Sequence, residues 1–345
     1  MKFRRGTALV AGAVTLSTLL VTVSGVGAGA STPARARAKS LPAAELAIVA
    51  YSTPQAAYEG IIPAFQKTTA GKNITFTQSY GASGDQSRAV AAGQTADIVE
   101  FSLEPDVTRL VDAGLVAKTW NKNKYNGFVT NSVAVIVTRS GNPKKLKTWA
   151  DLTKSGVDVV TPNPATSGSA RWNVMAGYGS QSNLGTNAAA GETYLNKLFK
   201  NVSVQPDSGR AALQTFTGGK GDALISYENE AVFAKQNGQS LSYTIPAKTI
   251  LIQNPVAVTS NTKHPKQAKA FLAFLYSKTA QKIFAKNGYR PVVPGVAKAD
   301  QFPTPKSLFT IDQLGGWTVV TKKFFDPATG TVTEIERNNG VATTK

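Results

Sequence analysis

The chain has 345 residues, 42% of them hydrophobic, and a formal net charge of +18, so it is long enough for about two domains. It contains no cysteine and one histidine, which excludes disulfides, thiolate chemistry and metal sites built from clusters of these residues. The lysines are scattered and not interleaved with aromatic residues, so the charge argues for an anionic ligand or anionic surroundings and against nucleic acid.

The first thirty residues have the three parts of an export signal. These parts are a basic start, an apolar run and a small-residue cleavage site, found at Lys2, Arg4, Arg5, residues 7–26 and Ala28-Gly29-Ala30. We predict a signal peptide over 1–30 and a flexible linker over 31–44, with an uncleaved anchor as the alternative. Because no cysteine can carry a lipid, we expect an exported protein that is not a lipoprotein.

From residue 45, strand and helix patterns alternate along the chain. The first set has strands over 46–51, 74–78 and 97–101 and helices over 54–68, 83–92 and 105–113. The second set has strands over 131–139, 157–161, 202–204, 223–226 and 250–259 and helices over 169–177, 188–199, 210–217 and 228–237. One long amphipathic helix is predicted over 265–287, with apolar residues at helical spacing.

This alternation predicts an α/β fold with two Rossmann-like lobes, each a parallel sheet with helices on both faces, and a cleft between them. We assign lobe I to residues 45–129 plus 258–345 and lobe II to residues 130–257. The chain would then cross between the lobes near 129–132 and 255–258, and we expect a hinge in these two crossing segments.

Four times a predicted strand runs through a short Ser, Thr or Gly segment into a helix start. The four segments are Ser52-Thr53-Pro54, Gly81-Ala82-Ser83-Gly84, Thr166-Ser167-Gly168-Ser169 and Asp207-Ser208-Gly209. Helix starts leave backbone N–H groups unpaired and carry partial positive charge, while serine adds a hydroxyl donor. Ligands of open α/β sheets bind beyond the carboxyl ends of strands. Together these segments predict a site for a small oxyanion.

Catalytic patterns are missing from the chain. The single histidine, His264, stands in a turn before a helix, so a Ser-His-Asp arrangement has no base. Glu228 with Glu230, and Glu100 with Glu104 and Asp106, are the only carboxylate groups that resemble a metal site, and we expect no metal or other cofactor. We therefore predict a binding protein rather than an enzyme; a secreted hydrolase and a basic envelope protein that binds polyanions are the other classes considered.

Several longer motifs carry a resemblance to a known family. They are residues 78–84 (QSYGASG), 96–99 (ADIV), 139–144 (RSGNPK), 161–164 and 166–173 (TPNP and TSGSARWN), 221–222, 228–231 (ENEA), 286–291 (KNGYRP), 308–312 (LFTID) and 315–317 (GGW). From about residue 47 to 325 the chain resembles the sulfate-binding proteins of bacterial ABC importers, which are type II periplasmic binding proteins. The resemblance implies a bilobed monomeric receptor that closes around one sulfate and presents it to permease subunits in the membrane.

The resemblance also implies the residues that hold the ligand. By position, the family's donors fall on the Ser83 hydroxyl, on the hydroxyl and N–H of Ser167, and on the N–H groups of Gly168 and Ser169. The N–H of Ser52 corresponds to a backbone donor that the family carries on an aspartate. In the segment after Asp207 the chain is one residue shorter than the family pattern, so the donor there is the N–H of Gly209 or Arg210.

Two side chains bear on which oxyanion is bound. The family's tryptophan is replaced by Tyr227, whose hydroxyl can donate or accept a hydrogen bond, whereas an indole N–H only donates. We interpret Glu100 as a solvated or ion-paired acid at a strand end; an inward carboxylate there would favour a protonated oxyanion. Sulfate is the preferred ligand, with thiosulfate, molybdate or phosphate as alternatives. Asp85, Arg88, Arg171 and Arg210 are expected to hold the donor loops by hydrogen bonds.

Overall fold

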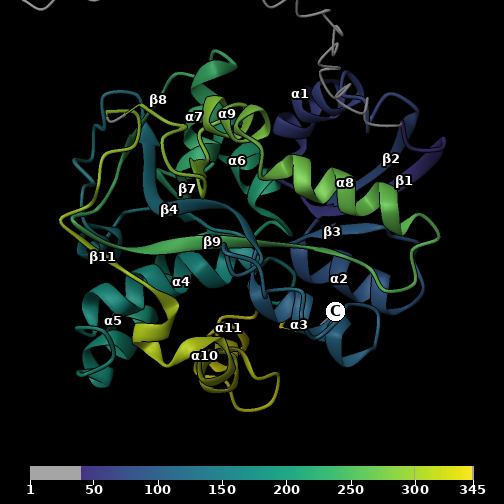
Figure 1. Cartoon of the computed structure of the whole chain (residues 1–345). Coiled ribbons are helices and arrows are strands. Elements are labelled where there is room, and N and C mark those ends of the chain that lie inside the picture. The colour runs from purple at the N-terminus through teal and green to yellow at the C-terminus, as the bar shows by residue number, and fades with distance from the viewer. Residues whose placement is uncertain (1–39, 299, 344–345) are drawn as a thin grey trace, which may run out of the picture. The chain divides into compact units, whose positions relative to one another are not determined.

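The computed structural model describes residues 40–298 and 300–343 (Figure 1). The predicted signal peptide and most of the predicted linker lie outside these residues. The strands are β1 Ala44–Tyr51, β2 Ile74–Gly81, β3 Ile98–Glu100, β4 Phe128–Arg139, β5 Val159–Val160, β6 Val202–Val204, β7 Ala223–Tyr227, β8 Leu241–Thr244, β9 Lys248–Val258, β10 Arg290–Pro291 and β11 Ser307–Phe309.

The α-helices follow the predicted pattern closely in the first two thirds of the chain. They are α1 Gln55–Gln66, α2 Ser83–Ala91, α3 Glu104–Asp112, α4 Gly168–Gln181, α5 Ala188–Asn201, α6 Gly209–Thr217, α7 Glu228–Gln236, α8 Pro265–Leu275, α9 Lys278–Lys286, α10 Gly316–Phe325 and α11 Thr331–Asn338. Two 3-10 helices, η1 Trp149–Thr153 and η2 Ile311–Leu314, complete the described elements.

The strands join in the order β2-β1-β3-β9-β4-β7-β5-β6, with β8 and β10 paired to β4 and β11 paired to β9. The outer pairs of this order are parallel, as expected, but the central pairs β3 with β9, β9 with β4 and β4 with β7 are antiparallel. The expectation of purely parallel sheets is therefore wrong at the centre. There the long strands β4 and β9 connect the first sheet region (β1 to β3) with the second (β4 to β8) (Figure 1).

Each face of the first sheet region is covered by helices. Ile48 and Ile98 share a buried cluster with Phe65 of α1 and Phe271 of α8, while Val49 points to the other face, where α2 and α3 pack. Phe65 and Phe271 meet edge to face with ring centroids 5.0 Å apart. Alternation along the strands thus directs successive side chains into two separate cores.

The second sheet region is covered in the same way, and the end of the chain joins it. One face packs against α6 and α7, and the other packs against α4 and α5. Trp317 of α10 belongs to the buried cluster on the face with α4 and α5, and its ring centroid lies 4.6 Å from that of Trp172 of α4. Ile335 of α11 belongs to the same cluster. Residues after 307 therefore pack against elements of the second region, although the predicted limits count them with lobe I.

The single helix predicted over 265–287 is wrong, because the structure has two helices there. α8 ends at Leu275 and α9 begins at Lys278. The Ser277 hydroxyl accepts a hydrogen bond from the N–H of Ala280 (3.2 Å), so this serine caps a new helix instead of continuing the old one. The apolar stripe is nevertheless a core stripe, with Phe271 and Phe284 fully buried.

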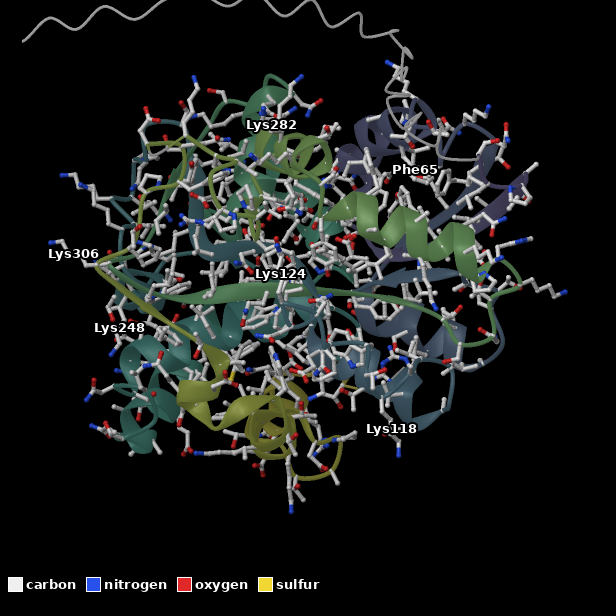
Figure 2. The ribbon with its side chains drawn as sticks, viewed as in Figure 1. Phe65, Lys118, Lys124, Lys248, Lys282 and Lys306 are labelled. Carbon is white, nitrogen blue, oxygen red and sulfur yellow. The ribbon has the colours of Figure 1, made fainter. Side chains whose placement is uncertain are left out.

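Among the described residues, no helix is both long and apolar enough to cross a membrane. Lys118, Lys282 and Lys306 are all exposed, and Figure 2 shows them at three separate places on the molecule.

Candidate functional site

The four predicted strand-to-helix segments meet at one place. The N–H of Arg210, at the start of α6, points to the Ser52 hydroxyl at 3.4 Å. The N–H of Gly84, at the start of α2, donates to the carbonyl of Thr166, two residues before the start of α4 (2.9 Å). Segments up to 158 residues apart in the sequence are thereby joined.

The start of α4 has the features of an oxyanion-binding helix terminus. Ser167 is its cap, and its hydroxyl lies 3.4 Å from the N–H of Ala170 and 2.8 Å from the Ser169 hydroxyl. Within residues 40–343, no hydrogen bond uses the N–H groups of Gly168 and Ser169. These two donors carry the partial positive charge of a helix start in a buried place.

Gly168 is required by close packing. A Cβ atom at this position would lie 2.7 Å from the Cβ of Ser102 and 2.8 Å from a methyl group of Leu103, which is closer than real contacts allow. Gly209 is also crowded, because a Cβ there would lie 2.8 Å from the Ser169 hydroxyl. Gly168 lets the start of α4 approach the loop after β3 in the first sheet region, and Gly209 lets the start of α6 approach the start of α4.

Ser83 is buried at the start of α2, but its hydroxyl already has partners. It donates to the carboxylate of Asp106 (2.6 Å) and accepts from the N–H of Ser102 (2.9 Å), and Asp106 also pairs with Arg109 (3.0 Å). Since a hydroxyl has one proton to donate, Ser83 would have to turn from Asp106 to donate to an anion.

Tyr227, at the end of β7, reaches the same group of residues. Its side chain is 1% exposed, and its hydroxyl lies 2.6 Å from the Ser102 hydroxyl. Burial raises its pKa well above the usual value for tyrosine, so the phenol keeps its proton. One member of this hydroxyl pair donates to the other, which leaves the second member a proton to donate elsewhere.

Sequence reasoning missed Ser102. It is fully buried, and its carbonyl accepts from the indole N–H of Trp172 (2.9 Å) and the amide of Asn254 (3.1 Å). The signal was present, because Ser102 follows a strand and precedes a helix as the other serines do. It stands alone, without the neighbouring glycine that marks three of the other four segments.

Arg210 joins the two sheet regions with its side chain as well. Its guanidinium donates twice to Glu230 (2.8 Å each) and once to the carbonyl of Thr53 (3.2 Å), and it stacks over the ring of Phe233 at 3.7 Å. Glu230 is almost completely buried. The Arg210 guanidinium is therefore paired with the Glu230 carboxylate and is not a free cation for a ligand.

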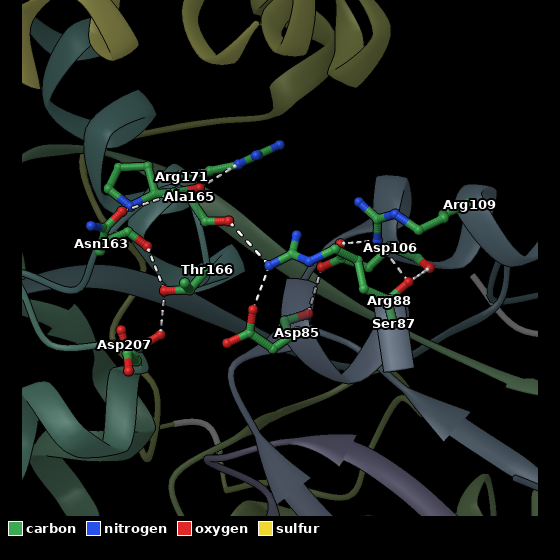
Figure 3. Close-up of polar contacts among 12 residues, drawn as sticks. Asp85, Ser87, Arg88, Asp106, Arg109, Asn163, Ala165, Thr166, Arg171 and Asp207 are labelled. Atoms are coloured by element: carbon green, nitrogen blue, oxygen red, sulfur yellow. Dashed lines mark hydrogen bonds and ion pairs between the residues drawn. The ribbon is translucent and has the colours of Figure 1, made fainter. Parts of the chain in front are cut away.

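The other charged residues predicted to hold the donor loops do contact them. Arg88 pairs with Asp85 and lies 3.4 Å from the carbonyl of Ala165, and Arg171 donates to the carbonyl of Pro164 (3.0 Å), as Figure 3 shows. These carbonyls belong to the turn that leads into α4. The turn therefore has an arginine contact from α2 and another from α4.

The interpretation of Glu100 as a solvated or ion-paired acid is wrong. Its side chain is fully buried, one oxygen accepts from the Tyr58 hydroxyl of α1, and the other oxygen has no hydrogen-bond partner. Burial raises its pKa to about 8, against the lowering effect of the Tyr58 hydrogen bond. The carboxyl contacts the core of the first sheet region rather than the serines.

The carboxylates considered as metal ligands have other partners. Glu228 pairs with Arg290 (2.7 Å) and Glu230 with Arg210 (2.8 Å). Among the residues that the structure describes, no group of three or more acidic or histidine side chains is arranged to hold a metal ion.

Comparison with known proteins decides the family. Residues 46–290 match the family described as bacterial extracellular solute-binding protein. The chain belongs to this family. It is 44% identical to the sulfate-binding protein of Synechococcus elongatus over 292 residues, which cover 81% of this chain and 83% of that protein. It is 37% identical to the thiosulfate-binding protein of Pseudomonas aeruginosa, over 80% of this chain and 88% of that one.

A solved structure agrees with the family assignment. The sulfate-binding protein SubI from Mycobacterium tuberculosis H37Rv is 44% identical, with a TM-score of 0.80, and the match covers 82% of this chain and 99% of that structure. The predicted α/β periplasmic-binding-protein fold is thereby confirmed. A solute-binding protein of this family also agrees with the prediction of a binding role.

Proposed function

We propose that this chain binds one sulfate ion outside the cytoplasm and delivers it to the permease subunits of an ABC importer. It acts as a monomer that needs no cofactor, binds no nucleic acid and catalyses no reaction. Its similarity to two proteins named as sulfate-binding proteins supports this proposal.

The meeting of four helix starts around buried hydroxyls is the observation that carries the proposal. The N–H groups of Ser52, Gly168 and Ser169, the Ser167 hydroxyl, and the N–H of Gly209 or Arg210 supply donors without free cations. The N–H of Ser167, which the resemblance also implied as a donor, instead donates to the carbonyl of Asn163 (2.8 Å). The hydroxyls of Ser83 and Tyr227 complete the set. Hydrogen bonds to an ionic acceptor contribute about 1.5–3 kcal/mol each, and more than five of them suffice for tight binding.

Binding would close two lobes around the ion. We assign residues 45–129 to one lobe and 130–257 to the other, with hinges near residues 129–132 and 255–258. Both hinges fall in β4 and β9, the strands that connect the two sheet regions. Residues after 258 return to the first lobe through α8 and α9, and the segment after 307 packs on the second. Closure then presents the loaded form to the permease.

We also propose that residues 1–30 direct export and are removed. The mature protein would then work in the periplasm or on the outer side of the cytoplasmic membrane. Without cysteine it carries no lipid anchor.

A second candidate ligand is another tetrahedral oxyanion, first of all thiosulfate. The thiosulfate-binding relative favours it. The Tyr227 hydroxyl can accept as well as donate, and this favours hydrogen phosphate rather than thiosulfate. Phosphate and molybdate are weaker candidates of the same class.

A thermal-shift titration of desalted mature protein with sulfate, thiosulfate, phosphate and molybdate at matched ionic strength tests the proposal. A ligand that binds only the folded protein raises the melting temperature with concentration. We expect a saturable shift with sulfate at the lowest concentration. A shift with thiosulfate or phosphate alone would show that this anion, and not sulfate, is the ligand. No shift with any of the four anions would overturn the binding role.

A further inference from the structure

Three arginine side chains converge outside the proposed sulfate site. Arg88 of α2, Arg109 of α3 and Arg171 of α4 line one cavity of about 290 Å³, which α11 closes with Thr333 and Glu336. Figure 3 shows the side chain of Arg171, from the first turn of α4, extending toward the other two arginines. Guanidinium groups repel one another, so their gathering in one cavity needs compensating negative charge.

Only two of the three arginines form an ion pair with a carboxylate. Arg88 pairs with Asp85 and Arg109 pairs with Asp106 (3.0 Å), whereas in the described part of the chain no carboxylate oxygen lies within 4 Å of Arg171. The one hydrogen bond that Arg171 makes there uses its Nε atom, so both terminal nitrogens retain their donors. Burial lowers the pKa of Arg171 and the neighbouring arginines lower it further, with the charges of Asp106 and Glu336 acting against them.

Glu336 adds an unused polar atom to the same cavity. Its residue is 2% exposed, and its Oε1 atom has no hydrogen-bond partner. Burial raises its pKa, and the positive charge of Arg171 opposes this shift. The carboxyl lies in one cavity with three guanidiniums and forms no ion pair within 4 Å with any of them.

We propose that this cavity is a second anion site, which takes a small inorganic oxyanion between Arg88, Arg109 and Arg171. The terminal nitrogens of Arg171, which make no hydrogen bond to the described residues, hold the ion in a two-pronged contact. The phenyl ring of Phe325 also lines the cavity, and it lies 5.0 Å from the Arg171 guanidinium, against which it packs.

An ion bound there joins helices from both sheet regions. α2 and α3 carry Ser83 and its partner Asp106, while α4 begins at the Ser167 cap. The second site is weaker than the proposed sulfate site, because two of its three cations are already paired with carboxylates.

Isothermal titration calorimetry with sulfate at low ionic strength tests this inference. We expect one tight binding event and one weaker event in the wild type. In Arg171→Met the weaker event should be lost or at least about tenfold weaker, since a two-pronged charged contact is removed. The control Lys322→Met removes one positive charge from the adjoining groove and should keep both events. A single event in the wild type, or an unchanged weaker event in Arg171→Met, would overturn the second site.

Wild-type crystals soaked in selenate provide a second readout that needs no variant. An anomalous peak between Arg88, Arg109 and Arg171 supports the second site. A peak beside Ser83 and Ser167 with none among the arginines contradicts it and leaves the proposed function intact. A peak among the arginines alone would contradict the proposed function and leave the second site standing.

Discussion

Three hydroxyl groups, of Ser83, Ser167 and Tyr227, belong to the proposed sulfate site, and the present hydrogen-bond partner of each one decides whether it can donate to a ligand. Tyr227 and Ser102 form a pair in which either oxygen can be the donor. Such a pair accepts as well as donates, so it tolerates an oxyanion that carries a proton. An indole N–H in its place would accept nothing and would favour a fully ionised anion.

Tyr227→Trp should therefore raise the preference for sulfate over phosphate. We expect a change of about tenfold, the effect of losing one hydrogen bond to the proton of phosphate. Competition of phosphate against bound sulfate at pH 6 and pH 8 measures this ratio. Tyr227→Phe serves as the control, because it removes the hydroxyl without adding a donor. An unchanged ratio in Tyr227→Trp would show that this side chain does not contact the ligand.

Glu100 makes the stability of the protein depend on pH. Its pKa is raised from 4.5 to about 8 in the folded protein, so the folded state binds the proton more tightly than the unfolded state. This contribution to the free energy of unfolding is complete below pH 4.5 and is lost as the pH rises to 8. Glu100→Gln should remove this slope and stabilise the protein at pH 8 by roughly 2–5 kcal/mol.

Chemical denaturation at pH 5 and pH 8 measures the effect. The matched control is Glu45→Gln, at an exposed position on the neighbouring strand β1, and it should leave the slope unchanged. If Glu100→Gln and wild type lose the same stability between the two pH values, the carboxyl is ionised in the folded protein.

At the scale of elements, local sequence patterns predicted most strands and helices. Alternation placed β1 to β7 and α1 to α7 within a few residues, because each has a clear apolar period and turn residues at its ends. The break between α8 and α9 was missed, since the apolar stripe continues across it and only the Ser277 cap marks it. The antiparallel centre was missed because strand direction depends on tertiary pairing rather than on local pattern.

The residues of the candidate site were likewise predictable where a local sequence pattern marks them, and not where they depend on tertiary contacts. Ser52, Ser83 and Ser167 stand in strand-to-helix segments that a local reading detects. The link between Ser83 and Asp106 spans 23 residues and depends on how α2 packs on α3, so no local pattern contains it. The burial of Glu100 likewise depends on Tyr58, which a different helix supplies.

The helix cap at Ser277 is open to a direct test. Ser277→Ala should lower the free energy of unfolding by about 1 kcal/mol, because the first turn of α9 loses its side-chain acceptor. Ser277→Asp should restore it. Thr279→Ala, at an exposed position of the same helix, is the control and should change little; equal losses in both alanine variants would argue against a specific cap.

At the scale of the whole molecule, Arg210 is one of the side chains that connect the two sheet regions near the site, through its hydrogen bond to the carbonyl of Thr53 (3.2 Å). Removing it together with the charge of its partner, in Arg210→Met/Glu230→Gln, avoids leaving a buried carboxylate alone. Small-angle scattering should show that sulfate reduces the radius of gyration of the wild type, and that the double variant needs about tenfold more sulfate for the same change. A wild-type radius that does not respond to sulfate would contradict lobe closure.

Equilibrium dialysis with radioactive sulfate tests the central claim most directly, because it counts bound ions without relying on stability. We predict one tightly bound sulfate per wild-type chain. In Ser167→Ala the affinity should fall roughly ten- to hundredfold, since a buried charged hydrogen bond and the cap of α4 are both lost. No saturable binding by the wild type, or equal affinity in the variant, would contradict a sulfate site built on these helix starts.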